Sequence, residues 1–152
     1  MKCKLYLFVT FLLTLIMNVA CLVACEKDGE TKAVSLEQVT RTMVVMKVTE
    51  AEENATALSA LTKLKEEGLI DFVAVDGTYG AYITSINGKE ETSSGASGYS
   101  WMIYTSDTEF SSTEYGAVEY NGVTYGQASL GASSLIVKAG QYYIWAYTEW
   151  SY

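Results

Sequence analysis

The side chains that could perform chemistry are few in this chain and of restricted types. Histidine is absent, which excludes Ser-His-Asp and Cys-His nucleophiles, HExxH zinc sites and imidazole proton shuttles. The carboxylates that come closest to a motif fall in two groups: Asp107, Glu109 and Glu114, and Asp76, Glu90 and Glu91. The first group lacks the spacing and central glycine of a calcium-binding loop. The second lies in predicted turns, where charges are expected without any glycosidase role.

A glycine- and serine-rich stretch at 93–98 is the remaining motif to consider. It lacks the lysine and the following helix of a phosphate-binding loop. We therefore expect solvated acidic loops, no metal site and no catalysis. The composition favours a binding or structural module over an enzyme.

The charge balance restricts the partners of the chain. Its 152 residues suit one ordinary domain with short extensions, and 18 acidic against 10 basic residues leave a formal net charge of −8. Binding to a nucleic-acid backbone requires clustered lysine and arginine, so this balance opposes it.

The first 25 residues have the pattern of a bacterial lipoprotein export signal. Lys2 and Lys4 precede an apolar run at 5–24, which ends in Leu22-Val23-Ala24-Cys25. That ending fits a lipobox, so 1–24 is the predicted signal peptide and Cys25 the predicted lipidated residue. Cys21 is the neighbouring alternative. An uncleaved transmembrane anchor is another, since 20 residues are long enough to span a bilayer.

The lipoprotein interpretation places the rest of the chain on the extracytoplasmic face of the bacterial cell membrane. Residues 25–42 are then the lipidated cysteine and a flexible tether, because 26–32 shows no apolar period. The mature chain has no second cysteine and cannot form an internal disulfide, so its core must be an ordinary hydrophobic one. The lipid on Cys25 is the one covalent group expected.

The folded domain is predicted over 43–152. Apolar residues alternate from Met43 to Val48, which predicts a strand. A helix should follow, with Asn54 as N-cap, a stripe of Leu58, Leu61 and Leu64, and Gly68 as the left-handed residue at its end.

The remainder is predicted to be β-structure joined by turns. Strands are expected at 72–75, 79–86 and 101–105, with a polar loop at 92–98. Two hairpins are expected, one at 117–126 around Asn121-Gly122 and one at 135–148 around Ala139-Gly140. One helix among several strands indicates an α+β class, and a single helix packed on a mixed sheet suggests a β-grasp-like fold.

Four segments resemble the DUF4430 family, the transcobalamin-like C-terminal domain. They read ALSAL at 57–61, YGAYITSING at 79–88, SWMIY at 100–104 and GQYYIWAY at 140–147. The resemblance covers about 43–148 and implies a β-grasp-like fold. Relative to shorter members of the family, residues 106–134 insert a long loop and a hairpin.

The resemblance also implies a ligand. In the animal cobalamin carriers this domain covers one face of the corrin, and the strand that carries Trp101 approaches it. Tyr99, Trp101 and Tyr104 are therefore the candidate ligand-binding residues, with cobalamin or another corrinoid as the candidate ligand. Tyr99 and Trp101 share a strand face by parity. Core or cross-strand packing is the alternative role that we favour for Trp101 and Trp145.

A second group of aromatic residues suggests a second class of function. Tyr115, Tyr120 and Tyr125 lie on or beside the inserted hairpin, and we expect them to be exposed. Tyrosine is common in binding surfaces because it offers a large contact area with a polar tip. The two predicted functions are thus a small-ligand binder and an adhesion or assembly module for a surface protein, a transporter or a glycan.

Overall fold

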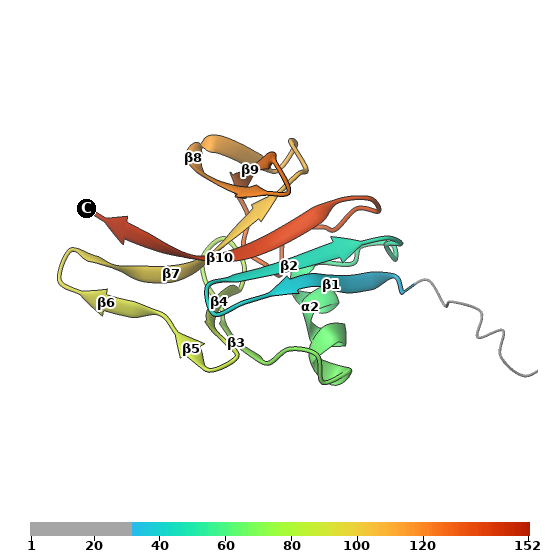
Figure 1. The fold of residues 1–152 in the computed structure, drawn as a ribbon, viewed down its shortest axis with the longest axis horizontal. Coiled ribbons are helices and arrows are strands. Elements are labelled where there is room, and N and C mark those ends of the chain that lie inside the picture. The colour runs from blue at the N-terminus through green and yellow to red at the C-terminus, as the bar shows by residue number, and fades with distance from the viewer. Residues whose placement is uncertain (1–31) are drawn as a thin grey trace, which may run out of the picture. The chain divides into compact units, whose positions relative to one another are not determined.

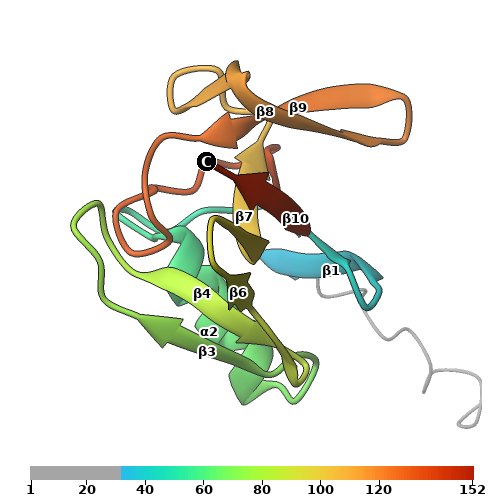
Figure 2. The same cartoon turned by 90° about the vertical axis from the view of Figure 1, so that its left-hand side faces the viewer.

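A computed structural model describes residues 32–152, which form one compact unit. The predicted signal peptide and Cys25 lie outside the described residues. The unit is built on a twisted main sheet (Figure 1), with a helix and a small sheet on one face, and the hairpin at one end of the main sheet folds over the other face. Figure 2 shows the hairpin and the helix on opposite sides of the main sheet. The single helix among many strands agrees with the α+β class.

The main sheet contains seven strands, six of them in the order β1-β2-β10-β7-β9-β8, with β6 also paired to β7. Their bounds are β1 Val34–Val39, β2 Met43–Val48, β6 Thr92–Ser94, β7 Ser97–Thr105, β8 Ser111–Tyr120, β9 Val123–Ala128 and β10 Tyr142–Ser151. Every strand pairing within 32–152 is antiparallel, so the predicted mixed sheet is wrong. The main sheet and the small sheet are therefore both antiparallel.

Strand β1 contradicts two predictions, the flexible tether at 25–42 and the domain start at 43. Residues 34–39 pair with β2 along its length, with Val34 opposite Val48 and Leu36 opposite Met46. Val34 and Leu36 pack against the main core. Val34 and Leu36 are two residues apart, so they lie on the same face of a strand. The segment joins the sheet because these two side chains bury apolar surface there.

The helix α2 spans Ala57–Glu66 and buries the predicted leucine stripe. Leu61 and Leu64 are fully buried and Leu58 is partly buried. The N-cap is Thr56, not Asn54: the Thr56 hydroxyl accepts the Ser59 N–H at 3.1 Å, and the Ser59 hydroxyl accepts the Thr56 N–H at 2.9 Å. Asn54 instead has a left-handed backbone in the turn before the helix.

The helix ends as predicted, at a left-handed Gly68. The Gly68 N–H donates to Lys65 O and the Leu69 N–H donates to Leu64 O, the two bonds of a Schellman motif. The small sheet then follows, with strands β3 Phe72–Val75, β4 Tyr82–Ile86 and β5 Lys89–Glu90 in that order. Asn87 and Gly88 both have positive φ and form the predicted tight turn between β4 and β5.

Two loop predictions need correction. The segment 92–98 was expected as a loop, but Ser94 pairs with Ser97 and Gly95 supplies the positive φ of a two-residue hairpin turn between β6 and β7. The hairpin expected at 135–148 does not form. Residues 135–138 contribute one isolated bridge, from Ile136 to Thr56, and β10 pairs with β2 and β7 instead.

The hairpin around Asn121-Gly122 is confirmed. Both turn residues have positive φ, and Tyr120 pairs with Val123 directly across the turn. The β8–β9 hairpin packs over one face of the main sheet and closes a second, smaller core of Val45, Tyr104, Tyr125, Ile144 and Ala146. The larger core lies on the other face, beneath α2, and contains Trp101 and Trp145, so the core role favoured for both tryptophans is confirmed.

Candidate functional site

Tyr99 and Trp101 lie on the same face of β7, as their parity predicted. Both contact Tyr147 of the neighbouring strand: the Tyr99 ring stacks on it at 5.4 Å, and the Trp101 ring meets it edge-on at 5.3 Å. Trp101 is only 3% exposed, and its indole N–H donates to the Lys89 carbonyl at 2.8 Å. A flat ligand could contact the Tyr99 ring, which is 40% exposed, but it could not contact Trp101, because that side chain is buried.

Tyr104 lies on the opposite face from those two residues. Its side chain is 1% exposed and belongs to the second core under the hairpin. The Tyr104 hydroxyl shares a hydrogen bond of 3.1 Å with the Thr148 hydroxyl. The three residues named from the family resemblance are therefore not brought together into one stacking platform.

The hairpin tyrosines differ in exposure. Tyr115 is 69% exposed, as expected. Tyr125 is buried, contrary to expectation, and Tyr120 is half-buried, because their rings and that of Tyr142 pack together at 6.1 to 6.5 Å between the hairpin and the sheet. Burial raises the pKa of the Tyr125 hydroxyl, with Tyr142 and Tyr120 adding to the effect. Of this group, Tyr115 is the one fully available to a partner.

A groove of about 740 Å³ lies where β7 and β10 diverge from the hairpin, and we call it the hairpin groove. Its floor comes from the face of β7 and β10 that carries Tyr104, and one wall comes from β8 and β9. Its lining side chains are mainly aromatic or neutral polar: Ser100, Met102, Tyr104, Tyr115, Gln127, Thr148, Trp150 and Tyr152. Tyr104 and Tyr115 are thus the two predicted site residues that the structure brings to one site.

The floor of the hairpin groove is held by specific contacts. The Trp150 indole N–H donates to the Ser100 hydroxyl at 3.0 Å, and the Trp150 ring lies 5.3 Å from that of Tyr152. Gly116 lets the wall come close, since a Cβ there would lie 2.9 Å from the Gln127 amide oxygen. The groove therefore presents aromatic rings beside hydroxyl and amide groups.

The electrostatics of the hairpin groove disfavour anions. Neither lysine nor arginine lines it, and the carboxylate of its one charged lining residue, Glu149, lies beside Tyr99 on the opposite face of the sheet from Tyr104. Glu149 sits opposite Tyr99 in the sheet register, and its carboxylate raises the pKa of the Tyr99 hydroxyl. The groove is accordingly suited to a neutral ligand that has apolar faces and hydroxyl groups.

The acidic group at 107–114 is not simply a solvated loop. Asp107 is 6% exposed, and its carboxylate lies 2.8 Å from the Lys138 ammonium, which also pairs with Glu109 at 2.6 Å. Hydrogen bonds to these two carboxylates raise the pKa of Lys138. The Lys138 ammonium thus pairs with the two carboxylates at the position where a metal cation would otherwise bind. In the part of the chain that the structure describes, no cluster of three or more metal-ligating side chains occurs.

Sequence reasoning missed the residues from β10 that complete the groove. Thr148 and Trp150 alternate with Tyr147 and Glu149, so the parity of the last strand carried a usable signal. That signal was lost because the strand was expected to stop at 148. The approach of Gln127 and Gly116 to the same place depends on how the hairpin folds over the sheet, for which the local sequence has no pattern.

No family profile, curated protein or solved structure matches the chain. Within residues 32–152, α2 is the one helix, and no helix is long and apolar enough to cross a membrane.

Proposed function

We propose that this protein is an extracytoplasmic lipoprotein, anchored through Cys25, whose folded domain binds a small ligand in the hairpin groove. The role is binding and not catalysis. The observation that carries the proposal is the hairpin groove itself: it is concave, about 740 Å³ in volume, and lined by Tyr115, Trp150 and Tyr152. Binding sites for small molecules commonly combine such aromatic walls with a few hydrogen-bonding groups.

Two ligand classes follow from different arguments. The resemblance at 79–88 and 100–104 supports a β-grasp-like DUF4430 domain and hence a corrinoid. In favour of that fold, α2 follows the β1–β2 pair and its leucine face packs on the main core. The lining of the groove supports a neutral polyhydroxyl ligand, for which aromatic faces and hydroxyl groups are suitable partners. Both ligands use the same site and are compared in one experiment.

Binding in the hairpin groove is expected to quench tryptophan fluorescence through one residue. Trp101 and Trp145 are buried, whereas Trp150 lines the groove. Titration of the full-length protein in detergent with cobinamide, cobalamin and neutral oligosaccharides should therefore quench the Trp150 emission with one of them and release heat. Because one stacking contact contributes on the order of 1 kcal/mol, Tyr115→Ala should weaken binding by about fivefold.

Tyr79→Ala is the matched control for that titration. Tyr79 is 75% exposed and Tyr115 is 69% exposed, but Tyr79 does not line the hairpin groove. The Tyr79 variant should bind like the wild type. Equal losses in both variants, or neither heat nor quenching with any of the ligands, would remove the groove from consideration as the site.

Anchoring is tested separately from ligand binding. Expressed in a bacterial host, the wild-type chain should incorporate labelled fatty acid, and Cys25→Ala should not. Continued labelling of Cys25→Ala would assign the lipid to Cys21. A wild-type chain that takes up no label would favour the uncleaved transmembrane anchor.

An adhesion or assembly role is the second candidate. It is favoured by two exposed side chains of the β8–β9 hairpin, Tyr115 at 69% and Val123 at 51%. A protein partner would cover this hairpin without needing the groove floor. Val123→Lys would then abolish partner binding while leaving small-ligand binding at Trp150 intact.

A further inference from the structure

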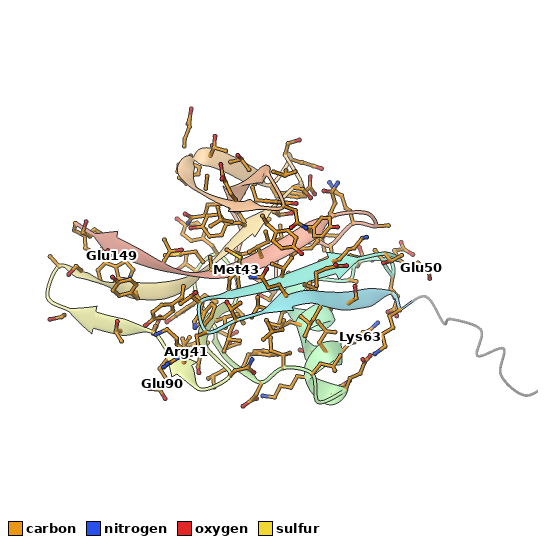
Figure 3. All side chains as sticks on the ribbon, in the orientation of Figure 1. Arg41, Met43, Glu50, Lys63, Glu90 and Glu149 are labelled. Carbon is orange, nitrogen blue, oxygen red and sulfur yellow. The ribbon has the colours of Figure 1, made fainter. Side chains whose placement is uncertain are left out.

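A second cavity, of about 500 Å³, lies between the β1–β2 turn and the β4–β5 turn, and we call it the turn pocket. Its lining includes Thr40 and Arg41 from the first turn, Asn87, Lys89 and Glu90 around the second, and Tyr147 of β10. Tyr147 and Thr148 are adjacent in a strand and point to opposite faces, so the turn pocket and the hairpin groove lie on opposite sides of the main sheet. Figure 3 shows Arg41 and Glu90 at this end of the molecule.

The turn pocket concentrates positive charge in a chain whose net charge is −8. Four of the basic residues between 32 and 152 form ion pairs: Lys32, Lys63, Lys65 and Lys138. The other three are Arg41, Lys47 and Lys89, none of which lies within ion-pair distance of an acid in that part of the chain. Two of these three line the turn pocket. Two like charges facing one cavity repel, and an anion between them offsets that cost.

The surroundings of Lys89 hold it in place. Its ammonium lies 4.0 Å from the centre of the Tyr147 ring, and its carbonyl accepts the Trp101 indole N–H. The Tyr147 hydroxyl donates to the next carbonyl, that of Glu90, at 2.9 Å. Two aromatic side chains of the main sheet thus fix the short strand β5, so the cation is positioned before any ligand arrives.

The turn that carries Arg41 is also fixed. The Thr40 hydroxyl accepts the Met43 N–H at 2.9 Å and lies 3.0 Å from the Met43 carbonyl, to which it donates. Arg41 is exposed, so its guanidinium keeps its hydrogen-bond donors available. A guanidinium presents a planar fork that matches the two oxygens of a carboxylate or phosphate, whereas the lysine adds a point charge.

We propose that the turn pocket binds the oxyanion group, a carboxylate or a phosphate, of a small organic molecule. Arg41 and Lys89 bind the oxyanion, and the side chain of Val39, which lines the pocket and is 43% exposed, contacts the apolar body. The volume of about 500 Å³ exceeds that of a bare ion and leaves space for such a body. Glu90 is the one acid that lines the pocket, and its carboxylate competes with the ligand. This site is distinct from the hairpin groove, so either can fail without the other.

The test uses the full-length protein in a non-ionic detergent, with calorimetry and amide chemical shifts as readouts. The probes are inorganic phosphate, phenyl phosphate and benzoate, each matched in ionic strength with sodium chloride. Saturable binding with a dissociation constant of roughly 1 mM is expected for phenyl phosphate, for benzoate or for both, with shifts at 39–41 and 86–92. Phosphate alone should bind more weakly because it lacks the body. Phenyl phosphate against benzoate distinguishes the two oxyanions.

Variants of the charged lining residues test which of them bind the oxyanion. Arg41→Gln should weaken binding about tenfold, since it removes charge-assisted hydrogen bonds. Lys89→Gln should also weaken it, and Glu90→Gln should strengthen it by removing the competing carboxylate. Lys47→Gln is the matched control, because Lys47 also lacks an ion-pair partner within 32–152 but does not line this pocket. Its binding should equal that of the wild type.

The proposal is overturned if none of the probes binds saturably, or if chloride at equal ionic strength produces the same shifts. It is equally overturned if Arg41→Gln binds like the wild type while circular dichroism shows both proteins folded. Arg41 is exposed and lies in a turn, so its loss is expected to leave the fold intact.

Discussion

Trp145→Ala should reduce the free energy of unfolding by about 3–5 kcal/mol, the range for truncating a buried aromatic side chain. Trp145 is fully buried and is the largest of the fully buried side chains within residues 32–152. It lies on β10 between two partners, opposite Val44 of β2 and Ile103 of β7, so the cavity would open at the centre of the main sheet. Because domains are commonly stable by only about 5–15 kcal/mol, a large part of the stability would be lost.

Trp145→Phe provides a sharper comparison than the alanine variant alone. The indole N–H of Trp145 is buried and makes no hydrogen bond to residues 32–152. Phenylalanine removes that unpaired donor, which offsets part of the cost of the smaller ring. Urea denaturation followed by circular dichroism should place the phenylalanine variant much closer to the wild type than the alanine variant. Equal midpoints for alanine and wild type would contradict the central packing role of Trp145.

The elements that were predicted correctly depend on chemistry within a few neighbouring residues. Asn87-Gly88 and Asn121-Gly122 adopt the positive φ values that such pairs tolerate, and each closes a hairpin. Gly68 likewise ends α2 through bonds to carbonyls one turn away. The burial of Leu61 and Leu64 follows from their spacing on one face of the helix. Local patterns of this kind determine local structure directly.

Two of the errors concern pairing between distant segments. Gly140 could close a local hairpin, but its N–H donates to Val48, and β10 then pairs with β2 and β7. The short segment 34–39 becomes a strand because β2 offers an edge and the core accepts two of its apolar side chains. Tertiary contacts decide these strand pairings, and the pattern of neighbouring residues carries no information about such contacts.

The candidate site residues also divide into those whose placement follows from local sequence and those whose placement depends on distant segments. The three-residue step from Trp101 to Tyr104 already places them on opposite faces of a strand, so their separation was readable from parity. The hairpin groove could not be predicted in this way, because Tyr115 and Trp150 line one groove only when the β8–β9 hairpin folds back over the sheet. The same holds for Arg41 and Lys89, which come from turns 48 residues apart and share the turn pocket.

Gly98→Ala should both destabilise the domain and disturb the hairpin groove. A Cβ at this position would lie 2.1 Å from the Thr92 carbonyl oxygen and 2.6 Å from Cζ2 of Trp150. The first contact involves backbone, so β6 must move away from β7. The second displaces a ring that lines the groove. Forcing atoms into packed structure costs about 1–3 kcal/mol, which thermal denaturation of Gly98→Ala would measure.

Ligand titration of the same variant links this packing to binding. Displacement of Trp150 should weaken the hairpin-groove ligand and change the Trp150 emission even without ligand, while probes of the turn pocket bind unchanged. Ser97→Ala, one position earlier on β7, is the control and should stay within about 0.5 kcal/mol of the wild type. The double variant Gly98→Ala/Trp150→Ala separates the two contacts, since it relieves the ring clash and leaves the 2.1 Å approach to Thr92. If Gly98→Ala left both the thermal midpoint and groove binding unaltered, β6 would not be held against β7 at this position.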